Sequence, residues 1–597
     1  MSPGFDMAHP QTRRFVSYEC VFCHDAYPKI PAGYVAPGVA PVFAGSLPEG
    51  IDCQRCHGPG ARHIATAQAA GAKPGDIRAS IVNPARLTPS LRMDLCMHCH
   101  LQPASGEIPS RIRRFNRAPY SFVPGEPLPN FLLVFDYAPG AGHDDQFEIV
   151  NSSAYRLRKS QCFLKSNGAM TCTTCHDPHQ ESHGAEAAKH YSDACRQCHA
   201  EAFQSSVSAG RHPAAAECVS CHMPKRRTDD AVHIATTDHF IQRVPPADLL
   251  AMKPEYYESD AAAYKGEVVP YYPAKLAPTP ENLLDVAAAQ IREGTNLKEG
   301  IPTLAALLQK YRPAHPEYYV ELAEALSTGG DAAHSQQYFD EALRLAPSST
   351  VIMLKLANAQ VTWQAWPRAE ATLRRVIARA PNDPVAWGLL GQSLFQQGKT
   401  PEAKAALNKA IVLDPDLAEP HNYLGAMLVR QNDLPGAEKE FRAALQLMPS
   451  NADWQSNLAG LLAAQGSVPE ARYLFERAIK LKPEAPGPRL NYARLLANLN
   501  LNKEAEQQAK AAVLADPGIP ASHELWGSLL SIMGDNEGAA RELRTAVNLQ
   551  PDFARAQYEL GVALLNKGDK AEATQHLRKA AQGNDPEVKA AAQKLLN

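Results

Sequence analysis

The sequence predicts a mainly α-helical chain made of two unlike parts, an irregular N-terminal domain followed by a C-terminal solenoid of paired helices. One pentapeptide, Cys-x-x-Cys-His, occurs six times within the first 222 residues. Prolines recur every 34 residues in the C-terminal half. The composition changes near residue 281, from sequence broken by proline and glycine to sequence rich in Ala, Leu, Glu, Lys and Gln. Together these observations place a cysteine-rich domain before a helical repeat array.

The six pentapeptides have the spacing of c-type haem attachment. In such a motif both cysteines form thioether bonds to one haem, and the following histidine binds the iron from the proximal side. The attachment cysteines are Cys20, Cys23, Cys53, Cys56, Cys96, Cys99, Cys172, Cys175, Cys195, Cys198, Cys218 and Cys221. The proximal histidines are His24, His57, His100, His176, His199 and His222. We therefore expect six covalently attached haem c groups.

Two other chemistries use Cys-x-x-Cys, namely redox-active dithiols and zinc sites. For a single copy of the motif these alternatives are as good as haem. Here twelve of the thirteen cysteines belong to the motifs and every copy ends in histidine. Neither a zinc site nor a structural disulfide requires that histidine. The repetition therefore favours haem over both alternatives.

Length and charge exclude some classes of protein. A chain of 597 residues predicts several domains. The 60 Lys and Arg nearly balance the 63 Asp and Glu, for a formal net charge of -3, so no basic excess indicates a nucleic-acid partner. No apolar run reaches the roughly 18 residues that a membrane-spanning helix needs, and we expect no transmembrane segment.

Residues 1–245 form the expected hexahaem domain, which holds 16 of the 21 histidines. Proline and glycine interrupt this part throughout, so long amphipathic helices should be scarce and short helices should carry the motifs. Bound porphyrins would supply the apolar core that such an irregular chain lacks. Short strands are predicted at 130–137 and 146–150, with Pro139-Gly140 turning between them.

Residues 246–280 form a connector in which prolines alternate with tyrosines. One interpretation is an extended linker; the other, which we favour, is a segment that packs along the haem domain through its aromatic side chains. Because the connector contains neither a haem motif nor the repeat register, we expect a fragment ending near Gln242 to bind all six haems.

Residues 281–597 carry the 34-residue period. Its prolines are Pro313, Pro347, Pro381, Pro415, Pro449, Pro483, Pro517 and Pro551, and small residues recur in the same register at Ala323, Ala357, Gly391, Gly425, Ala459, Ala493, Gly527 and Gly561. This pattern is typical of tetratricopeptide repeats. We expect eight repeats from Pro316, a degenerate repeat before them at 281–315, and the start of a capping helix at 588–597. Such an array offers a concave docking face. Its five histidines are expected at the surface: His315, His334, His421, His523 and His576.

Three stretches of the N-terminal domain support a family resemblance: Gly50 to Gly60 around the second motif, Met170 to His179 around the fourth, and Cys218 to Lys225 around the sixth. They resemble bacterial multihaem c-type cytochromes with doubled Cys-x-x-Cys-His motifs, in the broad group around the tetrahaem electron acceptor of hydroxylamine oxidation, here fused to a tetratricopeptide array. The resemblance implies periplasmic or surface electron transfer with mostly bis-histidine haems. Related proteins usually begin with a further motif, and the first residues show no signal peptide, so we expect the sequence to open at an internal point.

Distal iron ligands must come from the ten other histidines of this domain, or from methionine. Six are candidates: His9, His63, His179, His212, His233 and His239. His63 and His179 follow motifs on Gly-Pro and Asp-Pro turns, and His212 precedes the last motif beside a proline. His233 and His239 match positions that recur in the resembling family. His183 and His190 are reserves, and His98 should face away from the iron of its own motif.

Other polar residues leave alternatives open. Cys162, the odd cysteine, is expected to be a small buried apolar residue rather than a reactive thiol. Basic runs occur at Arg111, Arg113, Arg114 and Arg117 and at Lys225, Arg226 and Arg227. Guanidinium groups pair well with haem propionates, but a solvated face or a partner patch explains these runs equally well.

Electron transfer along closely spaced haems is the leading hypothesis. In it, the array docks a redox partner protein, another protein or a second copy of the chain. The alternative is a periplasmic multihaem reductase with one haem open to substrate, although the array contains no catalytic constellation, which favours a carrier over an enzyme. A third possibility is polymerisation into a filament. In each case the protein is expected to be periplasmic or extracellular.

Overall fold

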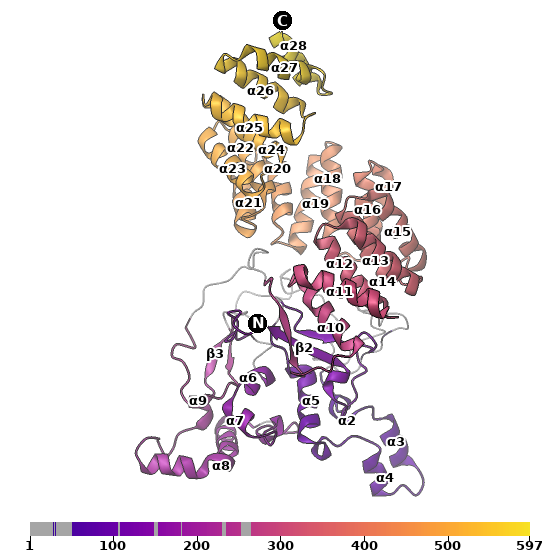
Figure 1. Ribbon diagram of the computed structural model, residues 1–597, viewed down its shortest axis with the longest axis vertical. Helices are drawn as coiled ribbons and strands as arrows, with labels where there is room; N and C mark the ends of the chain where they lie inside the picture. The colour runs from indigo at the N-terminus through magenta and orange to yellow at the C-terminus, as the bar shows by residue number, and fades with distance from the viewer. Residues whose placement is uncertain are drawn as a thin grey trace. The chain divides into compact units, whose positions relative to one another are not determined.

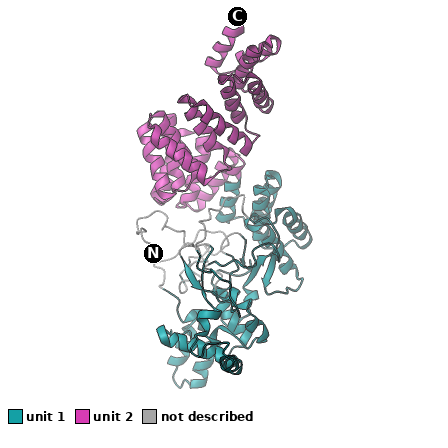
Figure 2. Cartoon of the chain, turned by 90° about the vertical axis from the view of Figure 1, so that its left-hand side faces the viewer, with its two compact units in different colours: residues 1–4, 14–359 teal, residues 5–13, 360–597 magenta. Residues whose placement is uncertain are grey.

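The computed structural model describes residues 50–104, 108–148, 153–180, 182–229, 234–251 and 264–596, together with Pro28 and Ile30. By their contacts the described residues fall into two compact units, one ending at Ala359 and one beginning at Gln360 (Figure 2). The boundary lies inside the repeat region, because the first helix pairs of that region pack with the haem-motif region. Each unit is described below by itself.

The haem-motif region combines short helices, loops and small sheets (Figure 1). Its helices are α2 (Gln54–His57), α3 (Ala61–Gln68), α4 (Pro74–Ala79), α5 (Pro89–His100), α6 (Ala154–Arg158), α7 (Gln161–Lys165), α8 (Gly184–Ser208) and α9 (Cys218–His222). Its strands are β1 (Arg111–Arg113), β2 (Leu132–Tyr137), β3 (Lys225–Arg227), β4 (Ala235–Thr237) and β5 (Val268–Tyr272). Four of the five described motifs lie on a short helix or a single helical turn, as expected. The fifth motif differs, because it lies within the 25-residue helix α8, which the broken sequence pattern did not predict.

A three-stranded antiparallel sheet in the order β1-β2-β5 forms the apolar centre of this region. Four successive residues of β2, Leu132 to Phe135, are buried. The strand predicted at 130–137 is therefore confirmed. The strand predicted at 146–150 is wrong for residues 146–148, because Phe147 bonds to the backbone and side chain of Asp229 instead of joining a ladder; residues 149 and 150 lie outside the described part.

The connector packs against the haem-motif region rather than extending from it. Strand β5 pairs with β2 in the register Val134 to Tyr272, although no strand was predicted here. The side chain of Gln290, on the next helix, α10 (Pro280–Ile291), bonds to both the N–H and the carbonyl of Val268. The favoured interpretation is confirmed for residues 264–280, whereas residues 252–263 lie outside the described part.

Helix α10 is fixed to the haem-motif region by a buried ion pair. Arg114 Nη1 lies 2.6 Å from Asp285 Oδ2, and the Tyr318 hydroxyl donates to Asp285 Oδ1 at 2.7 Å. Tyr318 belongs to α12, the first helix of the regular repeats. Asp285 is 1% exposed, so removing one partner would leave a charge buried without compensation.

The repeat region consists of helix pairs whose period matches the prediction. The degenerate pair is α10 and α11 (Leu297–Tyr311). The first helices of the eight pairs are α12 (Pro316–Thr328), α14 (Thr350–Thr362), α16 (Pro384–Gln396), α18 (Ala418–Arg430), α20 (Ala452–Ala464), α22 (Pro486–Asn498), α24 (Pro520–Ile532) and α26 (Ala554–Lys567). The second helices are α13 (Ala332–Leu345), α15 (Trp366–Arg379), α17 (Thr400–Leu413), α19 (Leu434–Leu447), α21 (Val468–Leu481), α23 (Asn502–Ala515), α25 (Asn536–Leu549) and α27 (Lys570–Ala581). The expected capping helix is α28 (Pro586–Leu596).

The recurrent small residues let the two helices of a pair approach closely. A Cβ added at Gly425 would lie 2.7 Å from two ring carbons of Phe441, and one added at Gly391 would lie 2.5 Å from Leu407 Cγ. Both distances are far inside van der Waals contact. The 34-residue period of small residues therefore reflects the close packing of the two helices in each pair.

One expectation about the array histidines is wrong. His523 was expected at the surface but is 5% exposed. Its Nδ1 lies 3.0 Å from the Glu542 carboxylate and its Nε2 lies 3.0 Å from the Pro517 carbonyl. Gln455 and Gln557, in the same register, also donate to the repeat proline. A buried polar side chain is tolerated here because both ring nitrogens have partners.

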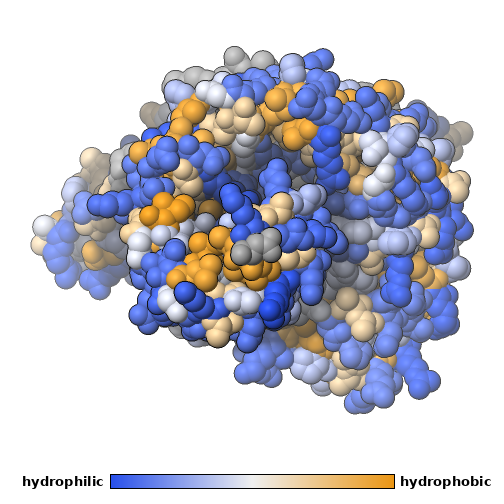
Figure 3. Space-filling view, turned by 90° about the horizontal axis from the view of Figure 1, so that it is seen from above, coloured by the Kyte–Doolittle hydropathy of each residue, from blue (hydrophilic) through white to orange (hydrophobic). Residues whose placement is uncertain are grey.

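The visible end face of the molecule is mostly hydrophilic, with apolar residues in small groups (Figure 3). Among the helices that the structure describes, none is both long enough and apolar enough to cross a lipid bilayer.

Candidate haem-binding sites

The structure describes five of the six motifs. Cys20, Cys23 and His24 of the first motif lie outside the described residues, as do the distal candidates His9 and His233. No disulfide joins the cysteines of the five described motifs. Within the described ranges, no three or more Cys, His, Asp or Glu side chains are grouped as a site for a bare metal ion.

Three motif histidines each face a histidine from elsewhere in the chain. The ring centres of His57 and His179 are 6.0 Å apart and their planes differ by 24°. Those of His176 and His239 are 6.2 Å apart, at 32°. Those of His212 and His222 are 6.3 Å apart, at 20°. Each pair joins one proximal histidine to one predicted distal candidate.

This separation is compatible with a metal ion shared by the two rings. Metal–imidazole bonds of about 2 Å on either side of an iron would place the ring centres roughly 6 Å apart. Direct ring stacking is closer, as between Tyr137 and His143, whose centres are 3.9 Å apart. The three pairs therefore leave room for an iron between the rings, and the residues present fit bis-histidine haem.

Hydrogen bonds at Nδ1 orient most of these rings. His57 Nδ1 lies 2.8 Å from the Val82 carbonyl, and His222 Nδ1 lies 2.8 Å from the Gln242 carbonyl. On the distal side, His212 Nδ1 lies 3.0 Å from the Pro213 carbonyl and His239 Nδ1 lies 3.2 Å from the Thr237 carbonyl. A carbonyl that accepts a hydrogen bond from Nδ1–H keeps the proton on Nδ1 and so leaves the Nε2 lone pair to bind a metal.

Three motif thiols lack the lowered pKa of reactive dithiols. Burial, followed by the nearby Cys218 and Cys175, raises the pKa of Cys195 to about 12. Burial also raises the pKa of Cys56 and Cys175. Redox-active Cys-x-x-Cys sites require a lowered thiol pKa, a condition that Cys172 meets through its neighbour Cys96 and that these three thiols do not.

Thiols of successive motifs are neighbours in space. Cys56 lies close enough to Cys96 for the two to influence each other's charge. A hydrogen bond joins Cys96 and Cys172, Cys175 lies near Cys195, and a hydrogen bond joins Cys195 and Cys218. The second to sixth motifs therefore follow one another in space in the order of the sequence.

His63 is oriented like a ligand but pairs with no described motif. Its Nδ1 lies 3.0 Å from the Ile77 carbonyl and 3.0 Å from Ser80 Oγ. Among the rings that the structure describes, none faces it at the separation of the three pairs. It stays a predicted ligand.

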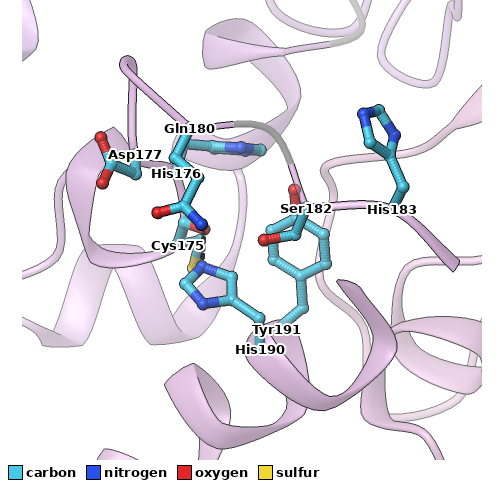
Figure 4. A pocket seen from close by; sticks show the side chains of 8 residues that line it. All are labelled: Cys175, His176, Asp177, Gln180, Ser182, His183, His190 and Tyr191. Carbon is cyan, nitrogen blue, oxygen red and sulfur yellow. Dashed lines mark hydrogen bonds between the residues drawn. The ribbon is translucent and has the colours of Figure 1, made fainter. Parts of the chain in front are cut away.

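The reserve histidines line a pocket beside the fourth motif. The pocket has a volume of about 240 Å³ and is lined by Cys175, His176, Asp177, Gln180, Ser182, His183, His190 and Tyr191 (Figure 4). His190 Nε2 lies 2.9 Å from the Cys175 carbonyl, so this nitrogen is already engaged. His183 stands apart from His176, on the other side of the view (Figure 4). Because the pocket includes Cys175 and His176, it belongs to the fourth motif.

His98 and His199 lie in opposite environments. His98 is buried, bonds to the Leu95 carbonyl and stacks on Phe122, and burial lowers its pKa to about 4. His199 is exposed on α8, and no other described histidine ring faces it. The fifth motif therefore has no second histidine ligand among the described residues.

The basic runs are satisfied by protein oxygens. Arg114 pairs with Asp285, Arg117 with Glu126, and Arg226 with Asp145. Neither a free partner patch nor propionate binding is needed to explain these three side chains. Cys162 is only half-buried, which differs from the expected fully buried residue.

Sequence reasoning missed the buried residues that support these sites. Asp94, two residues before the third motif, accepts hydrogen bonds from the Tyr272 hydroxyl and the Leu128 N–H. Arg156 is 0% exposed and pairs with Asp238, beside His239. Nothing in the local pattern marks these residues, because these three partners lie 34 to 178 positions away in sequence.

Comparison with protein families agrees with the division into an N-terminal motif region and a C-terminal repeat array. Residues 166–204 match the family described as the doubled CXXCH motif. Residues 282–527 match the C-terminal domain of cilia and flagella-associated protein 70, a tetratricopeptide family, and residues 524–588 match a tetratricopeptide repeat family. The chain therefore carries a doubled CXXCH segment followed by a tetratricopeptide array. No curated protein matches it.

Solved structures match over parts of the chain. One is the APC/C hetero-tetramer Cut9-Hcn1, at 13% identity and a TM-score of 0.40, covering 54% of this chain and 64% of that chain. The others are YrrB, a TPR protein with an unusual peptide-binding site (23% identity, TM-score 0.26, 32% of this chain and 99% of that one), and Pseudomonas aeruginosa pilF (20%, 0.33, 36% and 96%). The chain spans less than two thirds of the length of Cut9-Hcn1.

Proposed function

We propose that this chain is a multihaem c-type cytochrome that passes electrons along haems held in sequence order, with its tetratricopeptide array as a docking or assembly surface. The observation that carries the proposal is the set of three histidine pairs, each 6.0–6.3 Å between ring centres and each containing one motif histidine. Bound haem supplies reversible one-electron chemistry at its iron.

The chain's own contribution is to fix ligands and spacing. Carbonyl-bonded Nδ1 atoms hold His57 and His222 in one orientation, and a similar bond holds His239. Fixed ligands on both sides reduce rearrangement between oxidation states. The cysteines of successive motifs lie close together, Cys96 beside Cys172 and Cys195 beside Cys218, and this proximity of attachment points supports transfer from each site to the next.

The array supports a partner-binding role. Stacked helix pairs offer an extended surface. Ion pairs such as that between Arg544 and Glu572 join residues within the array. We propose a redox partner protein or a second copy of the chain as its ligand, with filament formation as the extended form of self-association. Because covalent haem attachment takes place on the exported side of the bacterial membrane, we place the protein in the periplasm or at the cell surface.

A reductase is the second candidate, and His199 favours it. This exposed histidine faces no other described histidine, so its haem could take an exogenous ligand. Carbon monoxide separates the two functions, because it binds only an open ferrous haem. If carbon monoxide binds at one haem, and this binding disappears when the fifth motif is removed, the result supports the reductase. If carbon monoxide binds at no haem, the result supports the carrier.

Mass spectrometry tests the cofactor itself. The denatured holoprotein should carry six haem masses, and the double substitution Cys195→Ser with Cys198→Ser should remove one. Cys162→Ser is the matched control and should leave all six. A chain without added haem, or with zinc in its place, would overturn the proposal.

A further inference from the structure

The segment Asp238–Gln242 serves two motifs at once. His239 faces His176 of the fourth motif. Three residues on, the Gln242 N–H donates to the His222 carbonyl at 3.1 Å, and the Gln242 carbonyl accepts from His222 Nδ1 at 2.8 Å. One short segment therefore supplies the second ring at the fourth motif and orients the proximal ring of the sixth.

Arg156 holds the start of this segment. Its Nε and Nη2 lie 2.9 and 2.6 Å from the two oxygens of Asp238. The guanidinium lies 5.4 Å from the ring centre of Phe147 and 5.2 Å from that of Phe240. Arg156 is 0% and Asp238 2% exposed. A planar, two-bonded and fully buried pair fixes direction as well as distance.

Ser160 holds the middle of the segment. Its hydroxyl donates to the His239 carbonyl at 3.3 Å and accepts from the Ile241 N–H at 2.8 Å. Ser160 is 0% exposed. Asp238 Oδ1 also accepts from the Phe240 N–H at 2.9 Å, so the backbone on both sides of His239 is held.

The charges around Arg156 have unequal roles. Asp145 also contacts Arg156, at 3.2 Å, but its side chain is 63% exposed and it contacts no residue of the segment. Arg226 bonds to Asp145 at 2.9 Å and approaches Asp238 at 3.8 Å. Asp238 is therefore the carboxylate through which the network acts on the segment.

We propose that Arg156 and Ser160 are positioning residues that hold Asp238–Gln242 as a shared support for the ligands of the fourth and sixth haems. This inference rests on the proposed function, because it requires His239 and His222 to bind iron. Neither residue touches a motif cysteine; both act through the segment that carries the ligands.

The test compares four variants of the full-length holoprotein. Arg156→Met removes the guanidinium group, and Arg156→Lys keeps a positive charge. Ser160→Ala removes only the hydroxyl, and Asp145→Asn removes the charge of the exposed carboxylate beside Arg156. Electron paramagnetic resonance and carbon monoxide titration count haems that lose their second ligand, and mass spectrometry counts attached haems. If Arg156→Met does not fold, Ser160→Ala still tests whether the segment positions the ligands.

We expect Arg156→Met to retain six haem masses but to convert at least one haem to a form that binds carbon monoxide. Ser160→Ala should shift the resonance of the fourth haem, Arg156→Lys should restore most of the low-spin signal, and Asp145→Asn should match the unmodified protein. Unchanged spectra in both Arg156→Met and Ser160→Ala would overturn the inference.

A separate variant distinguishes this inference from the proposed function. His239→Met changes the second ring itself. If it alters one haem while Arg156→Met and Ser160→Ala do not, the ligand assignment holds and the support is refuted. If His239→Met changes nothing either, His239 is not a ligand and the proposed pairing fails.

Discussion

Single histidines show most directly how this chain prepares a site. His57, His222, His239 and His212 each use Nδ1 to bind a backbone carbonyl. The carbonyl selects the tautomer and the ring direction, and it leaves the Nε2 lone pair available to a metal. His143 shows the contrast, because it stacks directly on Tyr137 at 3.9 Å and leaves no space for an iron.

Replacing one distal histidine should change one haem. In His212→Met we expect the sixth haem to become His/Met-ligated, or open, and its reduction potential to rise, because thioether ligation favours ferrous iron. A potentiometric titration followed in the visible spectrum measures this. His143→Met is the matched control and should leave every potential unchanged; the same result in His212→Met would remove His212 from the ligand set.

A buried carboxylate makes the stability of the repeat array depend on pH. Burial, followed by the nearby Glu524, raises the pKa of Glu559 from 4.5 to about 7. Between these values the folded state binds more protons than the unfolded state, so the free energy of unfolding should fall as pH rises through this window, by about 1 to 3 kcal/mol, and level off above it.

Glu559→Gln should flatten that pH dependence. All five tryptophans lie between Trp363 and Trp526, so urea unfolding followed by tryptophan fluorescence reports on the unit that contains Glu559. The exposed Glu484 provides the control, and Glu484→Gln should keep the slope of the unmodified chain. An identical slope in Glu559→Gln would show that another group titrates.

At the scale of elements, paired helices depend on small residues at their crossing points. Gly425 on α18 meets Phe441 on α19, and Gly527 on α24 meets Leu543 on α25. The same register recurs because each helix pair repeats one packing arrangement. In the haem-motif region the supporting element is instead a three-stranded sheet whose third strand, β5, comes from the connector.

Two glycine-to-alanine substitutions should have opposite effects. In Gly425→Ala the new Cβ would lie 2.7 Å from the Phe441 ring; overpacking costs about 1–3 kcal/mol and outweighs the gain in helix propensity. Gly460→Ala, on α20, meets nothing within 4 Å and should stabilise by about 0.5–1 kcal/mol. Urea midpoints from tryptophan fluorescence measure both. Equal shifts would show that propensity alone decides.

For the whole molecule, the boundary between the haem-motif region and the array matters most. A fragment ending near Gln242, which was expected to bind all six haems, would lose both β5 and the Asp285 partner of Arg114. The structure therefore predicts that this fragment loses stability and haem content.

A fragment ending at Leu345 should behave differently, because it retains β5, α10 and the Tyr318 contact with Asp285. Haem counting by mass spectrometry and thermal unfolding followed in the Soret band compare the two fragments. Full haem content and equal melting temperatures in both would show that the connector is dispensable and that the independent-domain interpretation holds.

The sequence by itself determined everything whose physical cause is local or periodic. A haem motif requires five adjacent residues, so its cysteines and proximal histidine can be read directly. A repeat array requires the same packing every 34 residues, so the roles of Gly391 and Pro415 follow from their positions in the period. Choosing His179, His212 and His239 as distal candidates drew on turns, prolines and family resemblance.

The tertiary structure alone decided which groups meet. His57 faces His179 across more than a hundred residues of chain, and Arg114 reaches Asp285 across 171 positions. Strand β5 of the connector forms by pairing with an edge of β2. Arg156 can hold its segment because the fold places Asp238 beside it. Such contacts are made once and follow no period, since they depend on how the chain closes in space.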